Sequence, residues 1–194
     1  MPTPSRSLSL VLVLLGAAGC ASPAGPPEQA VDPPATVLYF VRHAEKAAVP
    51  ADDPPLTAAG EARALALADT LAGVGLRAIY SSQYARTRAT AAPLAARAGL
   101  DVTVLPIAGP DVDATLRAQV RQIAAETFSH RALVVGHSNT IPTMIAELTG
   151  EPMADLEDTD YGTLFVVTLD GHPDDLAASD VALDRRRVGG PDPE

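Results

Sequence analysis

The chain has 194 residues, a length that suits one domain with a sizeable buried core. Apolar residues make up 47% of it, which is typical of a globular protein and not of a disordered one. The formal net charge is -10, and no predicted helix carries a run of Lys and Arg, so the composition argues against binding to nucleic acid. An anionic substrate would therefore need a local cluster of positive charge.

The first twenty residues have the pattern of a secretory signal. Arg6 precedes an apolar stretch at 8–15, which is too short for the helix of about 20 residues that spans a bilayer. Small residues then lead to Cys20, the only cysteine in the chain, so no intrachain disulfide can form. This run resembles the lipobox of bacterial lipoproteins, in which the cysteine is lipidated, although Ala17 stands where that family usually has leucine. The alternative is an ordinary signal peptide that is removed together with Cys20.

The segments on either side of the predicted domain have different compositions. Residues 21–35 contain five prolines and predict an extended tether. With a lipidated Cys20, the tether would hold the domain in the bacterial cell envelope, at the outer membrane or facing the periplasm, through the lipid anchor alone. Residues 181–194 include three consecutive arginines and are predicted to be a disordered, solvated tail. The folded domain is therefore expected at 36–180.

Predicted strands and helices alternate through this domain. Apolar and β-branched runs predict strands at 36–41, 78–80, 102–105, 131–135 and 163–169. Helical periodicity and capping residues predict helices at 58–72, 84–98, 111–128 and 140–148. This alternation is typical of an α/β fold with a mostly parallel central sheet and helices on both faces.

Polar residues follow three of the predicted strands. Arg42 and His43 follow the first strand, residues 81–86 follow the second, and residues 136–139 follow the fourth. A single histidine at a strand end is usually structural or solvated. Ligands of an open parallel sheet bind outside the carboxyl ends of the strands, so two histidines and two arginines at one edge indicate a site for an anion. The two serines at 81–82 are expected to cap the helix that follows them.

In their order along the chain, these motifs resemble those of the histidine phosphatase superfamily. The matching segments are Arg42-His43 and residues 56–60, 81–91 and 134–139, which spread over about residues 36 to 170. The resemblance implies a phosphoglycerate-mutase-like, three-layer α/β/α fold. It also implies a phosphatase that acts on phosphomonoesters or phosphohistidine, in a phosphorylated small molecule or a phosphoprotein.

The resemblance also implies a role for each site residue. His43 would be the nucleophile and become a phosphohistidine, with its other ring nitrogen held as an N–H donor, as we expect, by a backbone carbonyl. Arg42 and Arg86 would grip the phosphoryl oxygens, because a guanidinium matches phosphate in shape and charge. His137 would donate a hydrogen bond to a phosphoryl oxygen, and Asn139 would orient either His137 or the phosphate. No metal or cofactor is expected.

The sequence leaves the proton donor for the leaving group open. Asp111 and Asp113 lie in the region from which the family often draws this acid, and Glu45 lies beside the nucleophile. An alternative activity is a phosphoglycerate-type phosphomutase, but the chain lacks the long insertion between Arg86 and His137 with which the mutases enclose a sugar-acid substrate. Another alternative is a module that binds a phosphorylated ligand without turnover.

Overall fold

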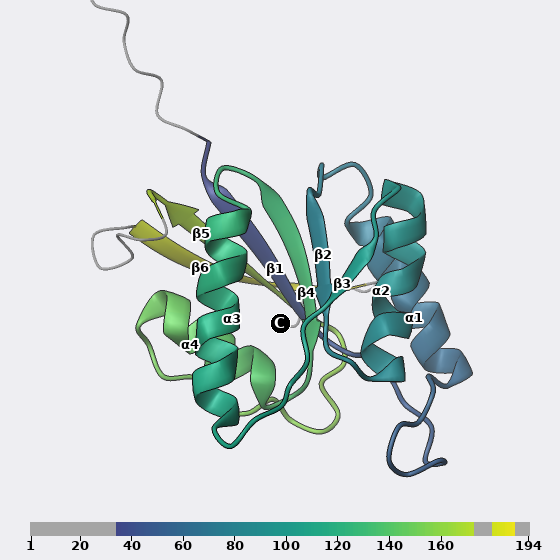
Figure 1. Ribbon diagram of the computed structural model, residues 1–194. Coiled ribbons are helices and arrows are strands. Elements are labelled where there is room, and N and C mark those ends of the chain that lie inside the picture. Colours follow the sequence, from purple (N-terminus) through teal and green to yellow (C-terminus); the bar gives the residue numbers. More distant parts are fainter. Residues whose placement is uncertain (1–33, 173–179, 189–194) are drawn as a thin grey trace, which may run out of the picture. The chain divides into compact units, whose positions relative to one another are not determined.

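The computed structural model describes residues 34–172 and 180–188 (Figure 1). The predicted signal, the lipidation site Cys20 and nearly all of the tether lie outside the described residues. Within the part that is described, none of the helices has the length and apolar character needed to cross a membrane.

Strands and helices alternate as the sequence predicts. The strands are β1 (Thr36–Arg42), β2 (Ala78–Ser81), β3 (Val102–Val104), β4 (Arg131–Gly136), β5 (Thr163–Asp170) and β6 (Asp180–Arg187). The helices are α1 (Ala58–Thr70), α2 (Ala85–Ala98), α3 (Val112–Glu126) and α4 (Thr140–Thr149). Every predicted element is present with small differences at its ends, and β6 is an addition.

Strand β6 corrects the prediction for the C-terminal residues. A disordered tail is expected from residue 181, but 180–187 pair with β5 in antiparallel register, from Asp170 opposite Asp180 to Thr163 opposite Arg187. The guanidinium of Arg185 lies over the ring of Phe165, 5.7 Å from its centroid. The charged residues that suggest a tail are typical of an exposed edge strand, where they discourage pairing with another chain. The folded domain therefore extends beyond residue 180.

The strands form one mixed sheet in the order β3-β2-β4-β1-β5-β6. Strands β3, β2, β4 and β1 are parallel to one another, and β5 and β6 are antiparallel to their neighbours. Both β1 and β4 are central and consist of near-continuous apolar residues, as expected of strands that are covered on both faces. Because β1, β2 and β4 run in the same direction, their carboxyl ends meet at one edge of the sheet.

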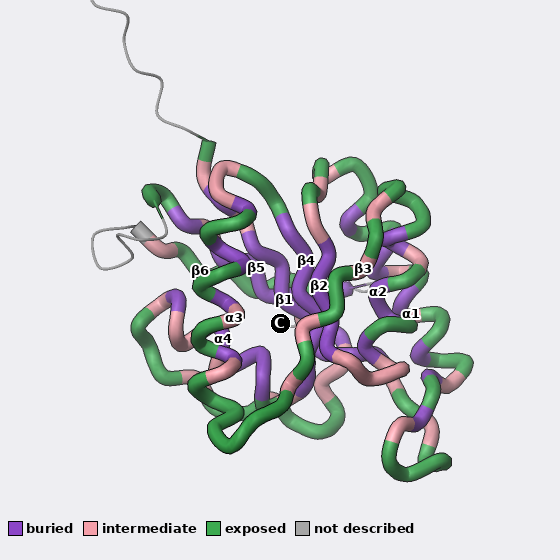
Figure 2. Tube along the Cα trace, in the orientation of Figure 1, coloured by how far each residue is buried: buried purple, intermediate pink, exposed green. Residues whose placement is uncertain are grey.

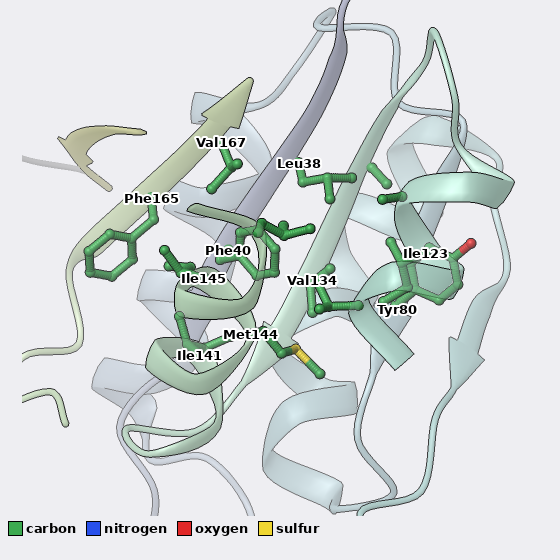
Figure 3. Packing of buried hydrophobic residues seen from close by; sticks show 14 of the residues in the cluster. Leu38, Phe40, Tyr80, Ile123, Val134, Ile141, Met144, Ile145, Phe165 and Val167 are labelled. Atoms are coloured by element: carbon green, nitrogen blue, oxygen red, sulfur yellow. The ribbon is translucent and has the colours of Figure 1, made fainter. Parts of the chain in front are cut away.

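The sheet lies between two pairs of helices (Figures 1 and 2). On one face, Phe40, Val134 and Phe165 pack with residues of α3 and α4 such as Ile145 (Figure 3). On the other face, buried residues of α1 and α2 pack against the alternate side chains of the same strands. Burial on both faces fixes the register of β1 against β4, because a slip by one residue would turn every side chain to the opposite face.

The start of α1 is fixed against the segment that follows β1. Thr57 N donates to the carbonyl oxygen of Glu45 at 2.9 Å, and Thr57 Oγ1 caps the helix by accepting from Gly60 N at 3.1 Å. Gly60 has helical backbone geometry and lies so close to Glu45 that an added Cβ would be 2.2 Å from the Glu45 carbonyl oxygen. The absence of a side chain at residue 60 is therefore what allows α1 to pack at this position.

Replacing Gly60 with Ala should destabilise the protein by about 2 kcal/mol, since the new methyl group would displace backbone atoms. Helix propensity alone would give the opposite sign, because Ala stabilises a helix by roughly 0.5–1 kcal/mol relative to Gly. Urea denaturation measures the difference, and the exposed neighbour Ala59→Ser serves as the control, with a change within about 0.5 kcal/mol. A Gly60→Ala protein as stable as the wild type would contradict the close packing.

Candidate active site

A pocket of about 470 Å³ opens at the carboxyl edge of the sheet. It is lined by residues that follow β1, β2 and β4, together with side chains from the segments before α3 and β5. The residues that line it are Arg42, His43, Lys46, Tyr84, Arg86, Ile107, Val112, His137, Ser138, Asn139, Thr140 and Asp158. Arg42, His43, Arg86 and His137 therefore lie around one pocket, although they come from three distant segments of the chain.

His43 is held at the end of β1 by two backbone hydrogen bonds. Its backbone N donates to the carbonyl oxygen of Gly136 at 2.9 Å, and its ring Nδ1 donates to the carbonyl oxygen of Ala44 at 2.8 Å. With Nδ1–H fixed in this way, the lone pair of the neutral ring is on Nε2. The residue is only 3% exposed, and burial lowers the pKa of His43 to about 4, with the charges of Arg86 and Arg42 adding to the effect and the Ala44 hydrogen bond opposing it. Near neutral pH the ring is therefore uncharged.

Arg42 is anchored by carbonyl oxygens of the segment between α4 and β5. Its NH1 donates to the carbonyls of Glu157 at 2.8 Å and Asp158 at 3.0 Å, and its guanidinium lies 4.3 Å from the ring centroid of Tyr161. Its Nε is buried and has no hydrogen-bond partner among the described residues. A buried N–H without a partner is costly, so this nitrogen is an unsatisfied polar group in a residue that lines the pocket.

Arg86, in the first turn of α2, lies between an aromatic ring and a carboxylate. Its guanidinium is 4.3 Å from the ring centroid of Tyr84, and its NH1 is 3.6 Å from Oδ1 of Asp53. The same Asp53 oxygen accepts from Ala85 N at 2.9 Å and so caps the helix that carries Arg86. The Nε of Arg86, like that of Arg42, is buried without a partner among the described residues.

His137 follows β4 and lies next to His43, with ring centroids 5.3 Å apart. Its backbone N donates to Thr140 Oγ1 at 2.8 Å, and its ring Nε2 is 2.9 Å from Ser82 Oγ. Burial lowers the pKa of His137 to about 3, and the neighbouring His43 and the two arginines add to this. Both rings of the pocket are therefore neutral near pH 7 in the absence of an anion.

The two serines after β2 do not cap α2 as the sequence predicts. Ser81 Oγ donates to the carbonyl oxygen of Ser82 at 3.0 Å, and Ser82 Oγ contacts Thr87 and His137. The cap is supplied instead by Asp53, from the loop before α1. The prediction fails because capping is inferred from neighbours in sequence, whereas this capping residue is more than thirty positions away.

The three candidate acids occupy different surroundings. Glu45 accepts from Arg63 Nε through both carboxylate oxygens at 3.0 Å, and the hydrogen bonds from Arg63 lower the pKa of Glu45. Asp111 Oδ1 accepts from Ala114 N at 2.9 Å as the N-cap of α3. Asp113 is exposed in the first turn of the same helix. None of the three lines the pocket, although Val112, between the two aspartates, does.

Asn139, at the N-cap position of α4, lines the pocket, and so does Lys46. Among the lining residues the only carboxylate is that of Asp158, whose exposed side chain is 4.0 Å from Arg42 NH2. Within the described residues, no three His, Cys, Asp or Glu side chains are grouped closely enough to hold a metal ion. The groups that do converge, two guanidiniums, one ammonium and two imidazoles, match the chemistry of a phosphoryl group.

Sequence reasoning missed three residues that support the arginines: Asp53, Tyr84 and Tyr161. Tyr84 lies inside a recognised motif, but the motif does not reveal that its ring stacks on Arg86. Tyr161 is over one hundred residues from Arg42, and no local pattern links the two. The acidic residues in 151–160 suggest ion pairs with Arg42, but the groups that accept hydrogen bonds from Arg42 are backbone carbonyls of this segment.

Residues 38–107 match the model of the histidine phosphatase superfamily, branch 1. Among solved structures, mycobacterial glucosyl-3-phosphoglycerate phosphatase Rv2419c is similar, with a TM-score of 0.63 and 18% identity over 77% of this chain and 97% of that one. The chain has the histidine phosphatase fold. A protein assigned as phosphohistidine phosphatase SixA from Nakamurella multipartitia is 28% identical, with a TM-score of 0.61 over 80% of this chain and 98% of that one.

A further structure with the histidine phosphatase fold, YhfR of Bacillus stearothermophilus, has a TM-score of 0.62 and 20% identity over 77% of this chain and 96% of that one. No curated protein matches the chain. The family match ends at residue 107 and includes His43 and Arg86. His137 lies beyond it, and the pairing of β4 with β1 is what brings this residue to the pocket.

The lowered pKa values of the two histidines predict how stability depends on pH. In the unfolded chain a histidine has a pKa of about 6.5, so between that pH and about 4 the unfolded state binds more protons than the folded state. The free energy of unfolding of the anion-free protein should therefore decrease as the pH falls from 7 to 5, by roughly 2 kcal/mol per buried histidine.

Urea denaturation at a series of pH values measures this dependence. His137→Gln should show a smaller decrease than the wild type, whereas His130→Gln, at an exposed position, should keep the wild-type dependence. The same pH dependence in His137→Gln and the wild type would mean that the buried ring is not held neutral.

Proposed function

We propose that this protein is a phosphatase that hydrolyses phosphomonoesters or phosphohistidine through a covalent phosphohistidine intermediate on His43. One observation carries the proposal. The uncharged ring of His43, with Nδ1–H held by Ala44, lines the same pocket as two arginines whose guanidiniums are each held over a tyrosine ring. A nucleophile and two preorganised phosphate donors are the groups that phosphoryl transfer needs.

In the first step, Arg42 and Arg86 bind the phosphoryl oxygens, and Nε2 of His43 attacks phosphorus. A P–N bond forms as the bond to the leaving group breaks, and the leaving group departs with the electron pair of that bond and is protonated. In the second step, water attacks the phosphohistidine and releases inorganic phosphate and a neutral His43. The charges of the arginines stabilise the negative charge on the oxygens throughout, and His137 shares a hydrogen bond with one of these oxygens.

The proposal includes a preference for good leaving groups. An alkyl leaving group needs a proton in the transition state, and none of the three candidate acids at 45, 111 and 113 lines the pocket. Aryl phosphates and phosphohistidine depend less on such an acid, because their leaving groups are more stable when they depart. The likeness to the SixA protein supports phosphohistidine as one substrate, in a phosphoprotein or in a small molecule.

We further propose that the phosphatase domain is tethered in the bacterial cell envelope through a lipid on Cys20. The support is the apolar stretch, the small residues and the single cysteine at the start of the chain, followed by the proline-rich segment. Expression in a bacterial host followed by membrane fractionation tests this. The wild-type protein should sediment with membranes and Cys20→Ser should not, and equal distribution of the two would contradict the anchor.

Hydrolysis of 4-nitrophenyl phosphate compared with an alkyl phosphate tests the proposed activity. The wild type should prefer the aryl substrate, and His43→Ala should lose at least about a thousandfold in kcat/KM, as is typical when a covalent nucleophile is removed. His130→Ala, an exposed histidine outside the pocket, is the matched control and should retain wild-type activity. Equal activity of His43→Ala and the wild type would refute the mechanism, and equal rates on aryl and alkyl phosphates would refute the preference.

A further inference from the structure

Three buried side chains form a continuous hydrogen-bonded chain behind the pocket. Thr87 Oγ1 is 2.8 Å from Ser82 Oγ, and Ser82 Oγ is 2.9 Å from His137 Nε2. Thr87 Oγ1 also lies 2.8 Å from the carbonyl oxygen of Tyr84. The three residues are 0%, 5% and 8% exposed, in the order Thr87, Ser82 and His137, so these groups have little access to solvent as an alternative partner.

The number of protons on the hydroxyl groups fixes the direction of each bond. A carbonyl oxygen can only accept, so the single hydroxyl proton of Thr87 is donated to Tyr84. Thr87 can then only accept from Ser82, which uses the single proton of Ser82. Ser82 is therefore an acceptor toward His137, and the ring nitrogen Nε2 must carry the proton.

This direction leaves the lone pair of the neutral His137 ring on Nδ1. Nδ1 has no hydrogen-bond partner among the described residues, and it is not one of the buried atoms that lack a partner, so it keeps contact with solvent. His137 lines the pocket. The pocket therefore holds two unprotonated ring nitrogens, Nε2 of His43 and Nδ1 of His137, rather than one nucleophile and one donor.

The charged and titratable groups around His137 do not supply a proton to Nδ1. His43 from β1 and Tyr84 from the start of α2 contact the ring, and Arg42 and Arg86 act on it through their charges. His43, Arg42 and Arg86 disfavour an imidazolium at His137, and Tyr84 does not stabilise one. The lining carboxylate, Asp158, lies beside Arg42.

We propose that Ser82 and Thr87 are positioning residues that hold His137 as its Nε2–H tautomer, so that the pocket binds a phosphoryl group together with one proton. The proton lies between His137 Nδ1 and a phosphoryl oxygen. A monoanionic phosphomonoester brings it as its own P–OH group, and a dianionic phosphomonoester, which has no hydroxyl, takes it from solvent on binding; no bond to phosphorus changes in this step. A dianion without the proton would place an acceptor oxygen against an acceptor nitrogen. The inference rests on the proposed function, since it requires that the pocket bind a phosphoryl group.

Calorimetry of phenylphosphonate binding at pH 8, in buffers of different ionisation enthalpy, counts the protons taken up. This non-hydrolysable analogue is mainly a dianion at this pH and then carries no hydroxyl, so the wild-type protein should take up about one proton per ligand bound. Thr87→Val removes the acceptor of the Ser82 hydroxyl and leaves the Tyr84 carbonyl with its backbone donor, Arg88 N. The Ser82 hydroxyl can then donate to Nε2, the proton of His137 moves to Nδ1, and uptake should fall to roughly half a proton or less.

Ser81→Ala is the matched control. It removes the buried hydroxyl of the neighbouring residue, and that hydroxyl forms its only hydrogen bond within the described part of the chain with the Ser82 carbonyl, so proton uptake should stay at the wild-type value. No proton uptake by the wild type would overturn the proposal, and so would equal uptake by wild type and a folded Thr87→Val protein. A loss of uptake in Ser81→Ala would show that the effect is not specific to the hydroxyl chain.

The ¹⁵N chemical shifts of the His137 ring show which ring nitrogen carries the proton, and this measurement requires neither a ligand nor a variant protein. Nδ1 should have the shift of an unprotonated ring nitrogen and Nε2 that of a protonated one; the reverse assignment would overturn the proposal. The proposed function and the proposed tautomer of His137 are distinguished by different results. A protein that neither binds phenylphosphonate nor cleaves 4-nitrophenyl phosphate lacks the proposed function, whereas one that binds phenylphosphonate with no proton uptake lacks only the proposed tautomer of His137.

Discussion

The parallel pairing of β1 with β4 is the constraint on which the site depends. Its last pair is Arg42 opposite Gly136, and the hydrogen bond from His43 N to the Gly136 carbonyl continues the ladder by one step. This pairing brings the residue after β1 beside the residue after β4, so that the two histidines lie with ring centroids 5.3 Å apart. The register is fixed in turn by apolar packing on both faces of the two strands. The stability of the core and the geometry of the pocket therefore have the same origin.

The pocket keeps its arginines charged and its histidines neutral by different means. Backbone carbonyls and a tyrosine ring hold Arg42, and Asp53 and another tyrosine hold Arg86, so each guanidinium is fixed while its Nε remains unpaired among the described residues. A guanidinium stays charged when buried, whereas an imidazole loses its proton. Burial near two permanent cations therefore produces uncharged imidazoles in a site that attracts anions, within a chain of net charge -10.

Much of the fold can be predicted from local patterns, because each helix and strand is specified by residues close together in sequence. The apolar run before Arg42 and the Thr57 cap are examples, and both are where they are expected. The strand at 180–187 could not be predicted in this way, because its stability comes from pairing with β5 and its exposed charges are typical of a tail as well as of an edge strand.

The same difference between local sequence patterns and contacts of distant segments applies to the site. The ends of parallel strands meet at one edge, so the convergence of His43, Arg86 and His137 follows from the predicted topology. The residues that orient them depend on contacts between distant segments, such as Tyr161 with Arg42, and no sequence spacing reveals these. The contact of Ser82 could not be predicted for a related reason: a serine before a helix usually caps it, but here the hydroxyl contacts the imidazole of His137, which follows β4.

The central claim is that His43 carries the phosphoryl group during turnover. Rapid denaturing quench of the protein with an aryl phosphate, followed by peptide mass spectrometry, tests this most directly. The account predicts an acid-labile, alkali-stable phosphate on the peptide that contains His43, and none in His43→Ala. Hydrolysis of the substrate by the wild type with the phosphate on another residue, or undiminished hydrolysis by His43→Ala, would contradict it.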